Sequence, residues 1–332
     1  MILDAHTHIF MRREHFPGDW LRDLAWREAR KSLPFGDPDE LVKNVKTEWM
    51  DPDGAKWAKD YEYCGIDISV NMPSDYAGAR EGYGSDAKTP IEEINREMCM
   101  LAKEYPGKLY SFIGVNPLRR NAVKLLERGV KEWGAIGLKL LPHTGFYPDA
   151  PECYRLYEKA AELKIPVTIH TGAGIFRNSK YAHPIHLEQP AMDFRRDLEF
   201  IAAHAGGGIG ELWEEMCTVA RYVPNINLEL AQVAPTVIKG GFRGNKGKYK
   251  DHIPQFIDIL DIMRNTLIGG CANILFASDY PTYPVEVLKE WVDLFKNLPA
   301  IAAQYGYDFS QEEADLMCYK NAARIMSISV LR

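Results

Sequence analysis

The 332-residue sequence has no long hydrophobic run. No apolar stretch approaches the ~18 residues that a membrane span needs, and the N-terminus lacks the charged and apolar regions of a signal peptide. Basic residues are not in excess, because the net charge is −6. The composition therefore gives no argument for nucleic acid as a partner. We expect a cytoplasmic protein that binds neither a membrane nor nucleic acid.

Cysteines are few, and their spacing shows no paired motif. The six of them are scattered along the chain, and no two form a C-x-x-C motif. A chain of this length does not need disulfide bonds to complete its core, so we expect reduced thiols. The glycine-rich run 240–250 lacks the Gly-Lys-Ser/Thr of a phosphate-binding loop.

The sequence does contain eight short apolar runs of the kind that form buried strands. Between them, apolar residues recur at helical spacing, and Ser310 with Glu313 forms a capping-box pattern before the last helix. Alternating strands and helices predict parallel βαβ units. Eight units favour a closed (β/α)8 barrel over an open, doubly wound sheet, in one domain spanning 1–332. The expected strands are 1–3, 66–73, 109–117, 135–142, 166–170, 200–208, 226–233 and 273–281.

The segment 11–63 separates the first two expected strands and is unusually rich in tryptophan, with Trp20, Trp26, Trp49 and Trp57. This aromatic content argues against disorder. We expect helices and loops inserted over the barrel mouth, where they serve as covering structure, as a substrate lid or as the surface of a homodimer.

Several polar residues lie where the expected strands end. His6 and His8 are two residues apart, so both imidazoles project to the same side of an extended chain. Two neutral imidazoles suit a divalent cation such as zinc. In a (β/α)8 barrel the carboxyl ends of the strands converge on one active site. The other polar residues at such ends are Lys139, His170, His204 and Asp279.

Four motifs in this order resemble the amidohydrolase superfamily. They are His6-Thr-His8 after an apolar strand, Ile169-His-Thr-Gly172, His204-Ala-Gly-Gly207 and Ala277-Ser-Asp-Tyr-Pro281. The sequence is most similar to the amidohydrolase-2 branch, which includes aminocarboxymuconate semialdehyde decarboxylase and related hydrolases and decarboxylases. The resemblance spans nearly the whole chain.

The resemblance implies that His6, His8, His170 and Asp279 bind one divalent metal ion, zinc in preference to manganese. Asp279 would also carry a proton during catalysis, and His204 would act as an acid or base beside the metal. A direct ligand role for His204 stays open, because two-metal relatives use the equivalent strand in that way. In those relatives a carboxylated lysine bridges the ions. We expect a single metal here, with Lys139 contacting substrate or supporting the structure.

We expect a small-molecule substrate, and a carboxylate substrate would need a cationic partner. Besides Lys139, the candidates for this role are Arg12 and Arg13, which follow the first strand, and Arg243 in the glycine-rich run. His143, His183, His186 and His252 are weaker candidates for substrate contact.

Two reactions fit the same ligands. The first is hydrolysis of a small ester, lactone or amide by a metal-activated water. The alternative is metal-dependent, non-oxidative decarboxylation of an unsaturated or aromatic carboxylic acid. The superfamily is mostly hydrolytic, so we favour the hydrolase. A non-catalytic barrel with a structural metal is a remote third hypothesis, since structural zinc sites leave no open coordination position.

Overall fold

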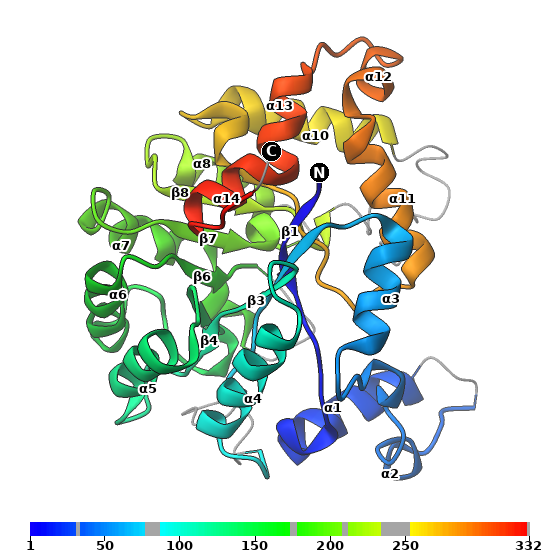
Figure 1. The fold of residues 1–332 in the computed structure, drawn as a ribbon, viewed down its shortest axis with the longest axis vertical. Helices are drawn as coiled ribbons and strands as arrows, with labels where there is room; N and C mark the ends of the chain where they lie inside the picture. Colours follow the sequence, from blue (N-terminus) through cyan, green and yellow to red (C-terminus); the bar gives the residue numbers. More distant parts are fainter. Residues whose placement is uncertain (31–33, 77–86, 173–177, 208–211, 234–252, 331–332) are drawn as a thin grey trace.

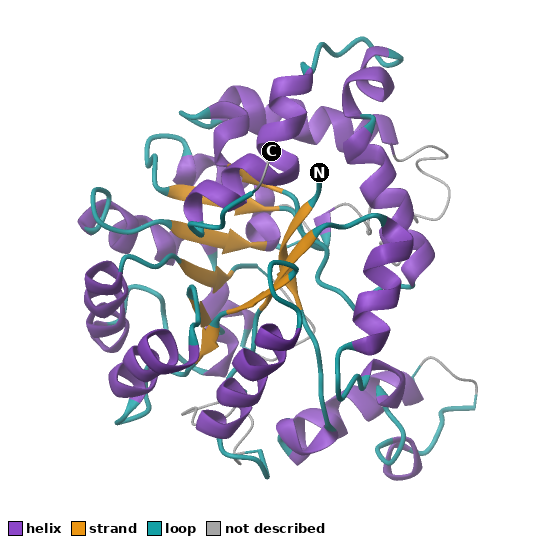
Figure 2. Ribbon diagram, viewed as in Figure 1, coloured by secondary structure: helices purple, strands orange, loops and turns teal. Residues whose placement is uncertain are grey.

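The structure is a computed structural model that describes residues 1–30, 34–76, 87–172, 178–207, 212–233 and 253–330. Parallel strands lie at its centre, and helices surround them (Figures 1 and 2). Each strand is buried from end to end or nearly so, as expected of apolar runs covered on both faces. The strands are β1 Leu3–Thr7, β2 Ile68–Asn71, β3 Leu109–Ser111, β4 Ile113–Gly114, β5 Leu138–Leu140, β6 Val167–His170, β7 Phe200–Ala203, β8 Ile226–Glu229 and β9 Ile274–Leu275.

Backbone pairing joins these strands into a ring. The order β1-β2-β3 forms one sheet and β4 to β9 a second, with parallel pairing throughout. Phe112 separates β3 from β4, and its N–H donates to Asn71 O over 3.0 Å, so the two form one interrupted strand. On the other side, Ala5 N–H donates to Phe276 O over 3.1 Å and His8 N–H to Tyr280 O over 2.7 Å. These bonds link the chain after β9 to β1, so eight strand positions close a TIM barrel.

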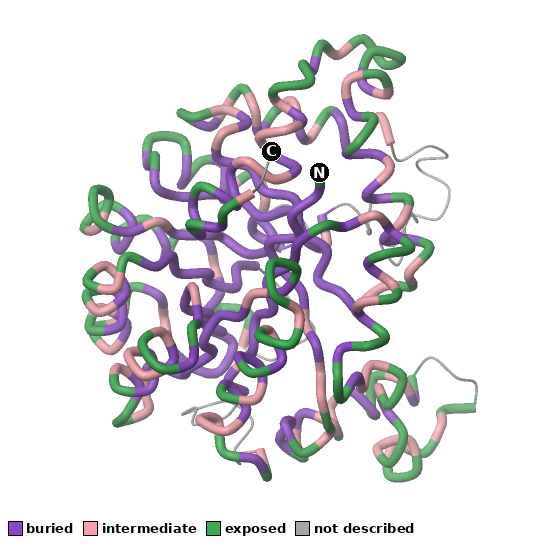
Figure 3. The backbone as a smooth tube through the Cα atoms, in the orientation of Figure 1, coloured by how far each residue is buried: buried purple, intermediate pink, exposed green. Residues whose placement is uncertain are grey.

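The helices form the outer layer, and the buried segments gather along the strands inside it (Figure 3). At one end of the barrel, residues of the last helix pack with Leu3 and Ile68, which places the C-terminal helix beside the N-terminus (Figure 1). Among the described residues, no helix is long and apolar enough to cross a membrane. The helices are α1 Gly18–Ala29, α2 Pro38–Leu41, α3 Ala55–Cys64, α4 Ile91–Glu104, α5 Ala122–Arg128, α6 Pro151–Leu163, α7 Glu188–Asp193, α8 Leu212–Ala220, α10 Ile253–Thr266, α11 Val285–Lys296, α12 Leu298–Ala303, α13 Gln311–Asp315 and α14 Asn321–Ile325.

All eight expected strands are present, but their bounds differ from the expected ones. The first begins at Leu3 and extends past the apolar run to Thr7, so His6 lies at the carboxyl end of β1 and His8 just after it. The others are shorter than their apolar runs; the last, for example, is paired only over Ile274–Leu275. Residues beyond the paired part of a strand are still buried and therefore still apolar. For this reason the apolar runs are longer than the strands.

The segment 11–63 divides into two parts. Phe16, Trp20 and Val45 form a separate small core together with Tyr76 and Leu141, which follow β2 and β5. This part therefore lies over the carboxyl ends of the strands, as expected of an insertion at the mouth. Helix α3 instead packs Trp57 and Tyr61 into the main core. It is the barrel helix between β1 and β2, so the insertion ends before Ala55 and not at residue 63.

Candidate metal centre

Three side chains from two strand ends meet at the mouth of the barrel. His6 Nε2 lies 3.1 Å from His8 Nε2 and 3.7 Å from Asp279 Oδ1, and His8 Nε2 lies 3.2 Å from the same oxygen. These atoms all fall within 4.8 Å of one another, close enough to bind one ion together. The alternation of side chains along β1 brings the two imidazoles to one side, as the spacing predicts. Asp279 reaches them because the chain after β9 pairs with β1.

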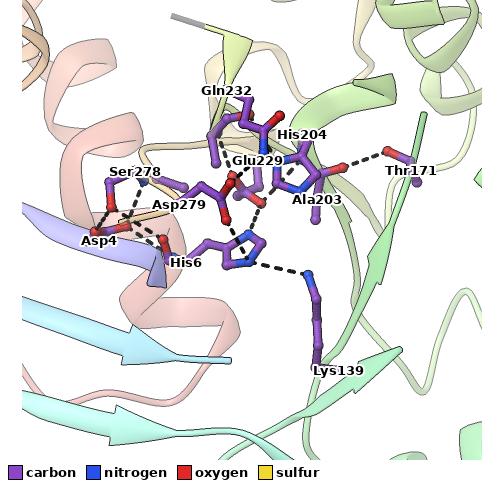
Figure 4. Close-up of polar contacts among 12 residues, drawn as sticks. Asp4, His6, Lys139, Thr171, Ala203, His204, Glu229, Gln232, Ser278 and Asp279 are labelled. Atoms are coloured by element: carbon purple, nitrogen blue, oxygen red, sulfur yellow. Dashed lines mark hydrogen bonds and ion pairs between the residues drawn. The ribbon is translucent and has the colours of Figure 1, made fainter. Parts of the chain in front are cut away.

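Glu229, at the end of β8, is a member of the site that the sequence analysis missed. Its Oε2 accepts a hydrogen bond from His6 Nδ1 over 2.7 Å, and both side chains are buried (Figure 4). A proton on Nδ1 leaves the lone pair of a neutral ring on Nε2, the atom that faces His8 and Asp279. The signal was available: a glutamate inside an apolar strand is almost never fully buried without a partner.

His204 stands next to His6, with 5.1 Å between the ring centroids. Its Nδ1 lies 3.2 Å from the carbonyl oxygen of Ala231, an acceptor, so Nδ1 carries the hydrogen and Nε2 the lone pair. With His6 and Glu229 it forms a second group whose ligand atoms lie within 4.8 Å of one another. The structure thus allows either role foreseen for His204, that of an acid or base and that of a ligand.

His170, at the end of β6, lies beside His204 and not beside His6. Its ring centroid is 4.5 Å from that of His204 and 4.6 Å from that of His143, a residue after β5. It belongs to neither of the two tight groups found among the described residues. The structure therefore brings His170 beside His204 at the carboxyl ends of the strands, but does not group it with His6, His8 and Asp279.

Lys139, on β5, points at the same centre. Its Nζ lies 3.4 Å from His6 Nε2, and the side chain is 2% exposed (Figure 4). Burial lowers the pKa of Lys139 to about 8, while the charges of Glu229 and Asp279 oppose the shift. The ammonium group is therefore still mostly protonated at neutral pH.

Burial also governs the other titratable groups. It lowers the pKa of His204 to about 4 and holds the pKa values of His6 and His170 well below their ordinary value. The imidazoles are thus neutral at pH 7, the form that binds metal. For Asp279, burial acts to raise the pKa, but the hydrogen bond from His8 and the electrostatic interaction with the neighbouring imidazoles outweigh it and lower the pKa.

The backbone is strained where the site residues leave their strands. His204, Gln232 and Asp279 have φ values of 66°, 66° and 57°, which non-glycine residues seldom adopt. The strained backbone brings Gln232 Nε2 onto Asp279 Oδ2, and Thr282 Oγ1 donates to the same oxygen over 3.1 Å. The oxygen Oδ1 is left facing the histidines.

Two glycines of the sequence motifs lie where a side chain would clash with the backbone of a neighbouring loop. A Cβ on Gly172, whose φ is +84°, would lie 1.9 Å from the carbonyl oxygen of Gly206. A Cβ on Gly206 would in turn lie 2.4 Å from the carbonyl oxygen of Leu212. The loops after His170 and His204 can approach this closely only as glycines.

Asp4 forms hydrogen bonds to both segments that carry candidate ligands, β1 and the chain after β9. Its Oδ1 accepts hydrogen bonds from the N–H groups of His6 and Ser278, over 3.1 and 2.9 Å. Its Oδ2 accepts from the hydroxyls of Ser278 and Tyr61. One buried carboxylate therefore ties β1, α3 and the chain after β9 together (Figure 4).

The expected arginine partners lie elsewhere. The guanidinium of Arg12 pairs with Glu97 and Glu93 of α4 and is 43% exposed, so the structure does not bring it to the histidines. Arg13 donates to the carbonyl oxygens of Val42 and Val45 and holds the insertion together. Arg243 lies outside the described residues.

The donor set fits a divalent cation. Two imidazole nitrogens and a carboxylate oxygen converge on one point, and the lone pair of His6 Nε2 is aimed there by Glu229. Nitrogen and oxygen donors of this kind bind zinc and also manganese. Fold and site together give a TIM barrel with a candidate metal centre at the carboxyl ends of its strands.

Comparison with known proteins identifies the family. The family model described as Amidohydrolase matches residues 3–327. The chain therefore belongs to the amidohydrolase family and is a metal-dependent hydrolase or carboxy-lyase. A search of curated proteins finds no match.

Solved structures share the fold at low sequence identity. 5-Carboxyvanillate decarboxylase from Novosphingobium aromaticivorans, in complex with manganese and 4-hydroxy-3-methoxy-5-nitrobenzoic acid, matches with a TM-score of 0.65 at 15% identity over 98% of this chain and 96% of that one. Dihydroxybenzoic acid decarboxylase from Polaromonas, with manganese and the inhibitor 2-nitroresorcinol, gives 0.63 at 15% over 100% and 98%. A probable 2-pyrone-4,6-dicarboxylic acid hydrolase from Acinetobacter baumannii, with citric acid bound, gives 0.59 at 14% over 98% and 99%.

Proposed function

We propose that this protein is a metal-dependent, non-oxidative decarboxylase of an aromatic carboxylic acid that carries a ring hydroxyl. The observation that carries the proposal is the buried ammonium of Lys139, 3.4 Å from His6 Nε2. Among the described residues, the site holds this cation and the carboxylates of Glu229 and Asp279, and burial favours the neutral forms of His6, His170 and His204. A divalent ion would leave one net positive charge in a buried place, which favours an anionic substrate.

The residues have distinct tasks in this proposal. His6, His8 and Asp279 would hold the metal, with His170 as a further candidate ligand and zinc or manganese as the ion. When bound, the ion would supply a Lewis acid for the oxygen atoms of the substrate. Lys139 would bind the substrate carboxylate by a charge-assisted hydrogen bond, the contact that an ammonium group makes well.

The reaction needs a proton at a ring carbon. The proton adds to the carbon that bears the carboxylate, and the bond between these two carbons then breaks. Its electron pair returns to the ring, and CO2 leaves. A ring hydroxyl donates electron density to that carbon and so eases protonation. Asp279 and His204 would hold the proton, because Asp279 Oδ1 lies 3.7 Å from His6 Nε2 and the ring of His204 lies beside that of His6.

Two structural neighbours are decarboxylases of aromatic carboxylic acids, and this likeness supports decarboxylation over hydrolysis. Hydrolysis stays the second candidate, because another neighbour is a probable hydrolase of a dicarboxylated lactone. A carboxylated lactone would suit the same positive charge. The two candidates share their ligands and differ in the product.

A product assay separates the two reactions. Protein loaded with Mn2+ or Zn2+ is incubated with 5-carboxyvanillate, 2,6-dihydroxybenzoate and 2-pyrone-4,6-dicarboxylate, and both CO2 release and ring opening are followed. We expect metal-dependent CO2 release from at least one hydroxybenzoate. Ring opening of the lactone without any CO2 release would instead establish the hydrolase.

A further inference from the structure

A small cavity lies beside His8. Most of its wall is apolar, formed by residues such as Phe10, Phe16 and Met98. The space open to the centre of a water molecule is about 20 Å3, enough for one water-sized group. The polar residues of the lining are Asn71, His15, Ser74, Tyr76 and His8 itself.

Asn71, the last residue of β2, presents a donor without a partner. Its Oδ1 accepts the N–H of Ile9 over 2.9 Å, which fixes the orientation of the amide. Its Nδ2 is buried and has no hydrogen-bond partner among the described residues, and the residue is 1% exposed. Leaving a buried amide donor unpaired is costly, so a ligand atom is expected there.

His15, in the short 3-10 helix Arg13–His15 of the insertion, presents the complementary acceptor. Its Nε2 lies 3.0 Å from Glu97 Oε2, a carboxylate that can only accept, so Nε2 carries the hydrogen. Within the described part of the chain its buried Nδ1 has no partner, and the residue is 5% exposed. Burial lowers the pKa of His15, which favours the neutral ring with a lone pair on Nδ1.

One donor and one acceptor in a one-group cavity match a hydroxyl. We propose that Asn71 and His15 form a subsite for a hydroxyl group of the substrate: the hydroxyl oxygen accepts from Asn71 Nδ2 and its hydrogen is donated to His15 Nδ1. In the free protein a water molecule takes the same place. A carboxylate does not fit, because it cannot donate to Nδ1. The position next to His8 puts the subsite one side chain away from the candidate metal ligands.

This inference rests on the proposed function, since it assigns a role to the ring hydroxyl of the substrate. It makes Asn71 and His15 specificity-determining residues. Sites built to hydrogen-bond a hydroxyl reject analogues that lack it, because their own polar groups are then left unpaired. The mouth insertion, which contributes His15, thus takes part in substrate selection.

The test compares two inhibitors by calorimetry on Mn2+-loaded protein. 2-Nitroresorcinol has two hydroxyls and 2-nitrophenol has one. We expect wild-type protein to bind 2-nitroresorcinol at least about tenfold more tightly, as one lost hydrogen bond of about 1.4 kcal/mol implies. In His15→Phe and in Asn71→Asp, which keeps the acceptor for Ile9 N–H, the ratio should approach one. His186→Phe, a change at a histidine paired with Asp149 outside this cavity, should keep the wild-type ratio.

A crystal structure of the metal-loaded free protein provides the second measurement. An ordered water within hydrogen-bond distance of Asn71 Nδ2 and His15 Nδ1 is expected, and an empty cavity would overturn the subsite. An unchanged ratio in both variants would overturn it as well. If neither inhibitor binds the wild type, the proposed substrate class fails and the crystal structure alone decides on the subsite. Ligand discrimination without CO2 release would keep the subsite and remove the decarboxylase.

Discussion

Glu229 and His6 are joined by a hydrogen bond of 2.7 Å between two buried side chains, on strands that are not neighbours along the sequence. The carboxylate fixes which nitrogen of His6 carries the hydrogen and so points the other at the metal position. Carboxylate partners of metal-binding histidines orient the ring and raise its basicity. The relationship makes the glutamate as much a part of the centre as the histidine.

Replacing this carboxylate should weaken metal binding without removing the ligands. Glu229→Gln keeps the shape and an acceptor oxygen but loses the charge, so we expect the affinity for Zn2+ to fall by about 10- to 100-fold. Competition with a chromophoric chelator measures the change. Glu199→Gln, at a carboxylate that accepts from Asn227 outside the cluster, is the matched control and should retain affinity. Equal affinities in both variants would show that Glu229 does not act on the metal.

Substitution of a metal ligand should remove the metal, whereas substitution of the acid or base should leave the metal bound. His8→Ala deletes one of three converging donor atoms, so we expect the variant to lose both the metal and turnover. His204→Ala should keep the metal and lose most of the rate, because the role assigned to His204 is to hold a proton. Elemental analysis of proteins purified without a histidine tag gives the content per chain. Loss of the metal from the His204 variant would make that residue a ligand.

Lys139 decides between one and two metals. We expect about one ion per chain, because the ammonium of Lys139 lies against His6 Nε2 and would occupy the space near a second ion. Lys139→Met should keep this ion and raise KM for a carboxylate substrate by about 10- to 100-fold, the loss of a hydrogen bond to a charged group. Two ions in the wild type, reduced to one or none in the variant, would instead identify a carboxylated, bridging lysine.

The barrel could be predicted because its signal is repeated along the chain. Eight apolar runs of strand length, separated by helical spacing, leave few other arrangements, and the capping box at Ser310 and Glu313 is present as expected. The strand ends could not be located, since burial continues past the last paired residue. Helix α3 was absorbed into the expected insertion for a related reason: tryptophan content does not distinguish barrel core from mouth covering.

The site could be predicted where function depends on position at a strand end. His6, His8 and Asp279 follow apolar runs, and parallel strands bring such ends together. Glu229 and Asn71 were missed because each lies inside an apolar run, where only the pairing with other strands reveals its direction. His15 was missed because its role depends on how the insertion folds over the mouth, and local spacing does not determine that fold.

The hydroxyl of Tyr61 should contribute measurably to stability. It donates to Asp4, the buried carboxylate that also binds the N–H groups of His6 and Ser278. Burial raises the pKa of Asp4 to about 7, so this carboxyl group is only partly ionised at neutral pH. Tyr61→Phe removes one of its donors, and an ordinary hydrogen bond is worth about 1 kcal/mol. We expect a lower Tm by calorimetry. In Tyr105→Phe, whose hydroxyl donates to Asp53 O at an exposed place, the Tm should change little. Equal, small shifts in both variants would show that the Asp4 network does not support the barrel.

The six cysteines should be unreactive while the protein is folded. All are buried and unpaired with one another, and burial raises the pKa values of Cys99, Cys217 and Cys318 to about 12. The thiolate is the reactive form, so at pH 8 almost none is present in the native state. With Ellman's reagent we expect little colour from native protein and all six equivalents after unfolding in guanidinium chloride. Rapid release of several equivalents before unfolding would contradict the packing of the helices against the barrel, since these thiols lie at that contact.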